Sequence, residues 1–413
     1  MDATLWKNSS FLKLWLAQLT ANIGDQCYSF ALLWYLLQAT KSGTALSLLA
    51  IPEMAAGLMF YLTGGVLADR YSPRLLMAGT DAARIVVVIS VGVMASFGVG
   101  QFGFFLAAQF LLGVFSSLFQ PARTVALKSI LPLELLGRAN GILDTTFRSI
   151  RILAPMTIGL LAGSVPLSAL FFANAASYLV SVFFVLTIRD SLKGKGGSTA
   201  SKLTLGQYKR DIATGASELR HTRDLFYILL FGNLGYLVWL VTYNVGFPFL
   251  AERMDQGNGS TLAMLMGFYG IGNLLGSLYM ARACYTRHLL VVLIGWMMQA
   301  AGFLLLTGGP AFHWLAFLGA ALAGVGGPLI GIPSVTAIQV KATDANVGKV
   351  YAINMLMYTC CGMLSSCLGA LWLGKLPVER LFLVSGLALV LLTVVGLAVE
   401  KRNHTTKHHS LDL

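Results

Sequence analysis

Residues 64–74 read Gly-Gly-Val-Leu-Ala-Asp-Arg-Tyr-Ser-Pro-Arg and connect two long apolar runs. The first run ends at Asp69 and Arg70, and a short polar segment follows before the next run begins. Charged side chains at the depth where a membrane meets water are costly unless they are paired or hydrated. The pattern therefore predicts two helices joined by a charged loop at a membrane surface. An ordinary basic loop without a gating role is the alternative.

The composition of the whole chain favours a membrane protein. Of the 413 residues, 56% are hydrophobic and only 11% are charged, and the mean hydropathy is +0.74. A soluble chain of this length carries roughly twice that charged fraction. Apolar stretches of membrane-crossing length recur throughout. They predict an all-α polytopic membrane protein with twelve spans, at about 11–39, 43–68, 75–98, 102–127, 139–163, 166–188, 225–250, 260–283, 289–308, 311–338, 347–374 and 377–400.

Six spans precede a polar stretch and six follow it, which predicts two halves. A shift of 211 positions places Gly65 on Gly276 and Gly113 on Gly324, as expected for two pseudo-symmetric halves. Within the polar stretch, Leu203–Leu219 has the pattern of an amphipathic helix at a membrane interface. The predicted parts are an N-terminal six-helix half (1–188), a cytoplasmic linker (189–224), a C-terminal six-helix half (225–400) and a cytoplasmic tail (401–413).

The distribution of basic residues predicts the orientation. Most of the 29 Lys and Arg residues face the cytoplasm if both termini are cytoplasmic, and the opposite orientation reverses this bias. We therefore expect a multi-pass protein of the cytoplasmic (inner) membrane with both termini inside. A net charge of +12 would suggest a nucleic-acid partner in a soluble chain, but orientation in the membrane explains it here, so no nucleic acid is expected.

The segment from Gly65 to Arg74 resembles the signature Gly-x-x-x-Asp-Arg-x-Gly-Arg-Arg of the major facilitator superfamily. That signature lies between the second and third helices, and here Ser72 replaces its glycine and Pro73 replaces the first arginine of the final pair. A second element, Asp-x-x-Arg at the start of the third span, is similar to Asp81-Ala-Ala-Arg84. The resemblance implies a major facilitator fold and a gating motif made of Gly65, Asp69, Arg70, Arg74, Asp81 and Arg84.

Further motifs resemble one branch of that superfamily. Residues 154–159, Ala-Pro-Met-Thr-Ile-Gly, are similar to the Gly-Pro-x-x-x-Gly element that efflux antiporters carry in the fifth span, which implies an antiporter motif at Pro155 and Gly159. Residues 119–122, Phe-Gln-Pro-Ala, followed by Leu131-Pro132 and Ala139-Asn140, resemble the connection between the fourth and fifth spans in the macrolide-efflux and enterobactin (siderophore) exporter branch. The resemblance covers nearly the full length and implies a drug–proton antiporter type of transporter.

Three acids within predicted spans are candidates for proton coupling. Asp25 lies at the midpoint of the first span, Glu53 follows Pro52 in the second, and Asp144 lies in the fifth. An ionisable group inside a membrane is expected to pair, to protonate or to face water. The alternative role of Asp25 is a structural hydrogen bond between two helices, and that of Glu53 is a carboxylate near the outer surface.

The fifth span also predicts a substrate site. Asp144, Arg148 and Arg151 follow an i, i+4, i+7 pattern and therefore project from one helical face. We expect Arg148 to pair with Asp144 and Arg151 to meet either Asp25 or an anionic substrate. A purely structural Arg–Asp network is the alternative. Other candidate substrate contacts are Asn22, Gln26, Tyr236, Trp239, Tyr243 and Asn244, although amides also hold membrane helices together.

These features predict a secondary transporter that exports a small molecule by proton antiport with alternating access. The surplus of intramembrane arginine favours an anionic or zwitterionic, siderophore-like substrate. A broad-specificity multidrug or macrolide efflux pump and a non-transporting membrane sensor are the alternatives. No nucleotide-binding loop, metal-ligand spacing or nucleophile–base pair indicates an enzyme. We expect a monomer in the lipid bilayer that uses the proton gradient and needs no cofactor or metal.

Overall fold

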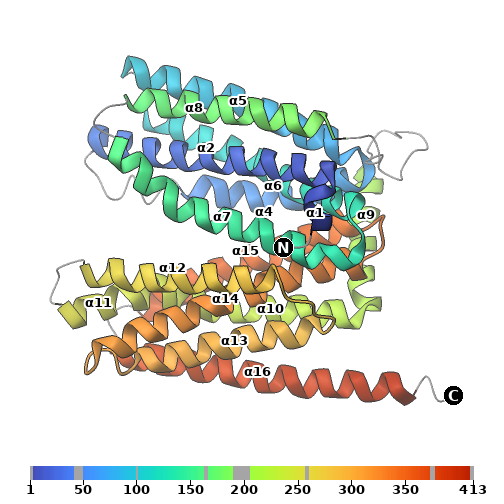
Figure 1. The fold of residues 1–413 in the computed structure, drawn as a ribbon, viewed down its shortest axis with the longest axis vertical. Helices are drawn as coiled ribbons and strands as arrows, with labels where there is room; N and C mark the ends of the chain where they lie inside the picture. Colours follow the sequence, from blue (N-terminus) through green and yellow to red (C-terminus); the bar gives the residue numbers. More distant parts are fainter. Residues whose placement is uncertain are drawn as a thin grey trace. The chain divides into compact units, whose positions relative to one another are not determined.

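The computed structural model describes residues 3–40, 50–98, 101–161, 166–188, 205–255, 260–372 and 377–409. Helices are the only regular structure within these ranges, as Figure 1 shows. The long helices are α2 (Ser9–Thr40), α4 (Ala50–Arg70), α5 (Pro73–Phe97), α6 (Phe102–Ile130), α7 (Leu133–Leu161), α8 (Leu167–Leu186), α10 (Arg223–Val241), α12 (Ser260–Met280), α13 (His288–Leu306), α14 (His313–Lys341), α15 (Val347–Trp372) and α16 (Val378–His409). Every predicted span therefore contains one long helix, and the all-α prediction is confirmed.

Three shorter helices and one π-helix complete the described chain. They are α1 (Ala3–Lys7), α9 (Leu205–His221), η2 (Thr242–Gly246) and α11 (Phe247–Asp255). The helix predicted at Leu203–Leu219 is thus present as α9. The predicted span 225–250 is a continuous helical segment in which the π-helix η2 separates α10 from α11. Such π-turns are rare and frequently lie at functional sites.

Eight of the described helices are both long and apolar enough to cross a membrane: α4, α5, α6, α8, α10, α13, α14 and α16. Helix α7 carries charged residues along its length, among them Glu134, Asp144 and Arg148. A membrane helix with such residues buries them against other helices rather than in lipid. The charged residues of α7 therefore direct attention to its polar face.

The chain forms two compact units. Unit 1 contains Met1–Leu136, Ser149–Glu218 and Ala342–Leu356, and unit 2 contains Gly137–Arg148, Leu219–Lys341 and Met357–Leu413. In unit 1, α2 and α5 pack on α8, and α4 packs on α6. In unit 2, α14 packs between α12 and α13, and α13 also packs on α16. The proposed division into halves at residues 188 and 225 stays a prediction.

Candidate functional site

Asp69 caps the N-terminus of a helix that is remote in sequence. Its Oδ1 accepts a hydrogen bond from the backbone amide of Gly348 at 2.7 Å, and its Oδ2 accepts one from the amide of Lys349 at 2.9 Å. Both amides belong to the first turn of α15, where backbone donors have no partner within the helix. The partial positive charge of a helix N-terminus also favours a carboxylate. Asp69 therefore ties the end of α4 to the start of α15 within unit 1.

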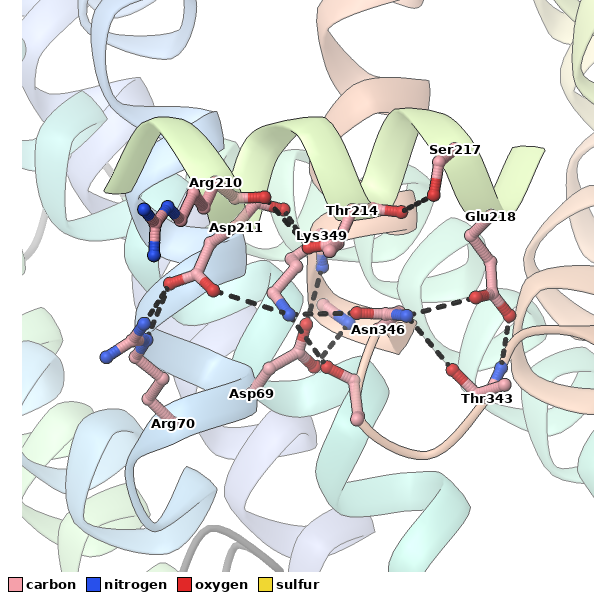
Figure 2. A network of polar contacts seen from close by, with 12 residues as sticks. Asp69, Arg70, Arg210, Asp211, Thr214, Ser217, Glu218, Thr343, Asn346 and Lys349 are labelled. Carbon is pink, nitrogen blue, oxygen red and sulfur yellow. Dashed lines mark hydrogen bonds and ion pairs between the residues drawn. The ribbon is translucent and has the colours of Figure 1, made fainter. Parts of the chain in front are cut away.

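Helix α9 adds a second acid to the same site, as Figure 2 shows. Asp211 accepts a 2.6 Å hydrogen bond from Nε of Arg70, and Nη2 of Arg70 lies 2.5 Å from the same oxygen. The other Asp211 oxygen lies 4.0 Å from Nζ of Lys349. Asp211 thus stands between a base of α4 and a base of α15.

The C-terminal part of α9 makes a separate set of contacts with the segment that leads into α15. Glu218 accepts hydrogen bonds from the backbone amide of Thr343 at 2.9 Å and from the side-chain amide of Asn346 at 3.0 Å. The side chains of Lys349 and Asn346 are joined in turn by a 2.8 Å hydrogen bond. We call these residues the Asp69 network: Asp69, Arg70, Asp211, Glu218, Thr343, Asn346 and Lys349.

Two glycines allow α4 and α15 to approach each other at backbone distance. A Cβ atom on Gly65 would lie 2.5 Å from the carbonyl oxygen of Gly348, and a Cβ on Gly348 would lie 2.6 Å from that of Gly65. Neither position accepts a side chain without movement of a backbone. Gly65 therefore permits close contact between the two helices, and its partner is another glycine.

The remaining residues of the predicted gating motif have other contacts. Arg74 donates a 2.9 Å hydrogen bond to the carbonyl oxygen of Ile188, just beyond the end of α8. Arg84 and Asp81 are joined by a 3.0 Å ion pair, and Ser181 of α8 donates a 2.7 Å hydrogen bond to Asp81. Asp81 is completely buried. This second pair links α5 to α8.

The Asp81–Arg84 pair lies next to Asp25. The guanidinium of Arg84 is 5.5 Å from the ring centre of Tyr178, and the hydroxyl of Tyr178 donates a 2.5 Å hydrogen bond to Asp25. Arg84 is also within electrostatic range of Asp25. We call Asp25, Asp81, Arg84, Tyr178 and Ser181 the Asp25 network. The network links Asp81 and Arg84 of the predicted gating motif to Asp25, one of the three candidates for proton coupling.

The other residues predicted around Asp25 make fewer contacts. Among the described residues, the side chains of Asn22 and Gln26 have no hydrogen-bond partner, and both are half-buried. Glu53 is exposed but lies within electrostatic range of Asp25 and Arg84. Arg151 is exposed and pairs with no other described residue. Of the two partners expected for Arg151, Asp25 accepts its hydrogen bond from Tyr178, and an anionic substrate stays a prediction.

Arg148 occupies a polar cluster of unit 2. Its Nε donates a 2.7 Å hydrogen bond to Asp144, which confirms the predicted pair, and its Nη1 donates one to Oδ1 of Asn273 at 2.5 Å. Ser277 of α12 donates a 2.5 Å hydrogen bond to the same Asp144 oxygen. Asp144 thus accepts hydrogen bonds from a residue of its own helix α7 and from a residue of α12, and Arg148 contacts α12 through Asn273.

An aromatic ladder runs along α10 in the same unit. Tyr236 stacks on Tyr358 with ring centres 3.9 Å apart, and Trp239 stacks on Tyr236 at 5.1 Å and on Tyr243 at 5.2 Å. Tyr269 of α12 completes the ladder, because its hydroxyl accepts a 2.8 Å hydrogen bond from Nε1 of Trp239. The side chains of three further candidates, Asn244, Pro155 and Gly159, lie outside the described part of the structure.

Comparison with protein families gives a direct match. The family model described as the Major Facilitator Superfamily matches residues 14–256, more than half of the chain. The chain belongs to the major facilitator superfamily. Its curated relatives in this superfamily include macrolide efflux protein A of Streptococcus pyogenes, with 21% identity over 94% of this chain and 95% of the relative. An uncharacterised transporter of the superfamily from Bacillus subtilis (strain 168), YfiS, has 25% identity over 97% and 96% of the two chains.

Solved structures of superfamily transporters share the fold. A bacterial homologue of the iron transporter ferroportin, in an outward-facing state, has a TM-score of 0.76 and 16% identity, and the match covers 95% of this chain and 99% of that chain. The human organic anion transporter MFSD10 has a TM-score of 0.74 and 13% identity over 94% and 99% of the two chains. This chain is therefore a polytopic membrane transporter with the major facilitator fold.

Proposed function

We propose that this transporter exports a small amphipathic molecule, with anionic or zwitterionic compounds favoured, across the cytoplasmic membrane by proton antiport. Its termini would be cytoplasmic, and the chain would act as a monomer by alternating access. The outward direction is supported by the macrolide efflux relative, which matches 94% of this chain. Protons, substrate and lipid are the only partners that the proposal needs.

The observation that carries the proposal is the Asp25 network. Asp25 and Asp81 lie on two different helices, and the buried Arg84, which pairs with Asp81, lies over the ring of the buried Tyr178 that donates to Asp25. Ionisable groups inside a membrane mark ion pathways by default, because their burial costs free energy that a purely structural role seldom requires. Asp25 would carry the proton, and Tyr178 and Arg84 would hold the carboxylate in place.

The Asp69 network would serve as the gate of the same cycle. It joins α4, α9 and α15 through a helix cap, an ion pair and a backbone contact between two glycines. Several short interactions that break together give a two-state element, which alternating access requires. The network would be intact in one state of the transporter and broken in the other.

The test is substrate uptake into inverted membrane vesicles with and without an imposed proton gradient. The panel contains carboxylate siderophores, macrolides and hydrophobic cations, and the proteins are wild type, Asp25→Asn and the control Asp344→Asn, whose acid is 55% exposed. We expect gradient-driven uptake in wild type and Asp344→Asn, and its loss in Asp25→Asn. Unchanged gradient-driven uptake in Asp25→Asn would move proton coupling to Glu53 or Asp144. No gradient-driven uptake of any compound would contradict export by antiport.

A broad-specificity efflux pump is the second candidate, and the aromatic ladder favours it. Several stacked rings offer contact area to many hydrophobic molecules without selecting one of them. Under this alternative, macrolides and hydrophobic cations would be transported as well as carboxylates, and replacing Arg148 by glutamine would leave cation transport unchanged. The vesicle panel therefore separates the two candidates by the charge of the transported compounds.

A further inference from the structure

Arg148 and Asp144 form an ion pair in which each side chain keeps an open hydrogen-bonding position. Nε of Arg148 donates to Oδ2 of Asp144 at 2.7 Å, and Ser277 donates to the same oxygen. The other carboxylate oxygen, Oδ1, has no hydrogen-bond partner among the described residues. The side chains of Arg148 and Asp144 are 27% and 25% exposed, so neither is sealed inside the protein. One acceptor position therefore stays open on the acid.

The arginine contributes open donors close to that acceptor. An arginine has five N–H donors. Asp144 takes the Nε donor, and Oδ1 of Asn273 takes one of the two donors on Nη1 at 2.5 Å. The other three donors of Arg148 face no partner in the part of the chain that the structure describes. Nη2 of Arg148 and Oδ1 of Asp144 are each two covalent bonds from the atoms of the 2.7 Å contact, so the open donors and the open acceptor lie close together.

Helices α12 and α14 hold the arginine in place through Asn273. Nδ2 of Asn273 donates to the backbone carbonyl oxygen of Tyr269 at 3.1 Å, which leaves Oδ1 to accept from Arg148. A Cβ atom on Gly327 of α14 would lie 2.7 Å from that Oδ1. At this point α14 therefore approaches the amide with a half-buried glycine and places no side chain against it. The position of the guanidinium thus depends on Asn273 and on the absence of a side chain at residue 327.

The charges of the pair select the kind of ligand. Arg148 and Asp144 neutralise each other, and an unpaired charge inside a membrane is costly. A lone carboxylate would bring a second negative group to one arginine, and a lone ammonium group would bring a second positive group to one acid. Either ligand would leave a net charge where electrostatic interactions are strong. A zwitterion adds no net charge, and its two groups can bind the open donors and the open acceptor at once.

We propose that Arg148 and Asp144 form a recognition site in unit 2 for zwitterionic head groups of the α-amino-acid type. The carboxylate of the ligand binds the open donors of Arg148, and its ammonium group donates to Oδ1 of Asp144. Both groups of such a ligand are attached to one carbon, which matches the short separation of the open donors and acceptor. Asn273 is a positioning residue. This inference rests on the proposed export function and selects the zwitterionic class among the substrates favoured there.

The test measures equilibrium binding to the purified full-length protein in detergent by isothermal titration calorimetry, which needs no transport. Three probes are compared: L-leucine, 4-methylpentanoate, which lacks the ammonium group, and 3-methylbutylamine, which lacks the carboxylate. All three carry the same branched side chain, so only the charged groups differ. We expect L-leucine to bind most tightly and each singly charged probe to bind about tenfold more weakly, because it loses one charge-assisted hydrogen bond.

Two charge variants should change the selectivity in opposite directions. Asp144→Asn retains the shape of the acid without its charge, so the affinity for 4-methylpentanoate should rise about tenfold relative to that for L-leucine. Arg148→Gln should instead favour 3-methylbutylamine. A merely structural pair would weaken the binding of all three probes without changing their order. Each variant is first checked for a sharp gel-filtration peak and for its melting temperature.

Gly327→Ala tests the positioning of the arginine. The added methyl group would meet Oδ1 of Asn273 at 2.7 Å and displace the acceptor of Arg148. The control is Gly331→Ala, one turn further along α14, because nothing lies within 4 Å of a Cβ at that position. We expect Gly327→Ala to weaken the binding of the two carboxylates but not of 3-methylbutylamine, and Gly331→Ala to match wild type. Asn273→Ala should show the same difference between carboxylates and amine.

Three outcomes would overturn the inference. They are the absence of L-leucine binding to wild type, equal affinity of wild type for the three probes, and charge variants that keep the wild-type order of affinities. The wild-type comparison decides by itself where a variant does not fold. L-Leucine is also added to the vesicle panel. L-Leucine binding without uptake into vesicles supports the site and contradicts export, whereas gradient-driven uptake of other compounds without L-leucine binding supports export and overturns the site.

Discussion

The carboxylate of Asp69 accepts a 2.7 Å hydrogen bond from the backbone amide of Gly348, 279 positions further along the chain. Gly65, one turn earlier on α4, packs against the same residue, because a Cβ atom added to it would lie 2.5 Å from the carbonyl oxygen of Gly348. Helix α9 then covers the contact with Asp211 and Glu218, as Figure 2 shows. A helix cap, a glycine pair and helix α9 are thus combined at one place in unit 1, and each can be tested separately.

Replacing Asp69 by asparagine should weaken the cap without changing its shape. Asparagine retains one carbonyl oxygen but loses the charge that the N-terminus of α15 favours, so the expected loss of stability is about 1 kcal/mol. The apparent melting temperature in detergent measures it. The control is Asp344→Asn, which removes a mostly exposed acid paired with Lys128 and should have little effect. Equal melting temperatures for the two variants would contradict the capping role.

Asp211 should matter more than Arg70 for the stability of the same region. Asp211→Asn removes the partner of Arg70 and of Lys349 at once, whereas Arg70→Gln leaves Lys349 in place. The double variant should lose less free energy of unfolding than the two single variants together. The difference, which is the coupling energy between Asp211 and Arg70, should be about 0.5–1 kcal/mol. Strictly additive losses would show that the ion pair contributes nothing. The contribution of the Arg70–Asp211 ion pair to stability should also decrease at high salt, because both side chains are partly exposed.

Alanine at Gly65 should disrupt the contact between α4 and α15. The added methyl group would meet the Gly348 carbonyl at 2.5 Å, and relieving such an overlap costs about 1–3 kcal/mol. Gly79→Ala is the matched control, because nothing lies within 4 Å of a Cβ at that helical position. The control should gain about 0.5–1 kcal/mol from helix propensity. A Gly65→Ala variant as stable as Gly79→Ala would refute the close contact.

Replacing Asp81 alone should destabilise the protein more than replacing both members of the buried Asp81–Arg84 pair. Asp81→Leu leaves Arg84 buried without its ion-pair partner, with Asp25 and Glu53 only within electrostatic range, and breaking a buried ion pair in this way costs about 3–5 kcal/mol. Replacing both residues by leucine removes the charge as well and should restore part of the loss. The yield of monodisperse protein and its melting temperature measure the effect. A double variant less stable than Asp81→Leu would contradict this reading of the pair.

Much of the fold follows from the sequence because membrane helices are specified locally. An apolar stretch of sufficient length must be a helix in lipid, since its backbone groups have no other partners there. Each predicted span therefore contains a helix, and the pair Arg148–Asp144 was predictable because it lies within one helical turn. The π-helix η2 was not predicted, because residues 225–250 are apolar almost throughout, so the sequence shows no helical face whose shift would mark an extra residue.

The contacts between helices were harder to predict. Tyr178 and Ser181 were missed as partners of Asp25 and Asp81, although Asn174, Tyr178 and Ser181 recur at i, i+4 and i+7 in a mostly apolar span. That polar stripe was a usable signal for the face of α8 that meets other helices. No comparable signal connects Asp69 to Gly348. A backbone amide is present at every non-proline residue, so only the tertiary fold selects which amide the carboxylate meets.

Helix η2 also sets the angular register of the chain that follows it. One additional residue in a helical turn rotates every later side chain by about 100° relative to an uninterrupted α-helix. A relative that lacks the π-turn can align with this chain without a gap and still direct the residue equivalent to Phe247 toward a different neighbour. Residues after Gly246 that are aligned in two transporters therefore need not point in the same direction. A role assigned to a residue of that segment in one transporter applies to the aligned residue of another only when both contain the π-turn.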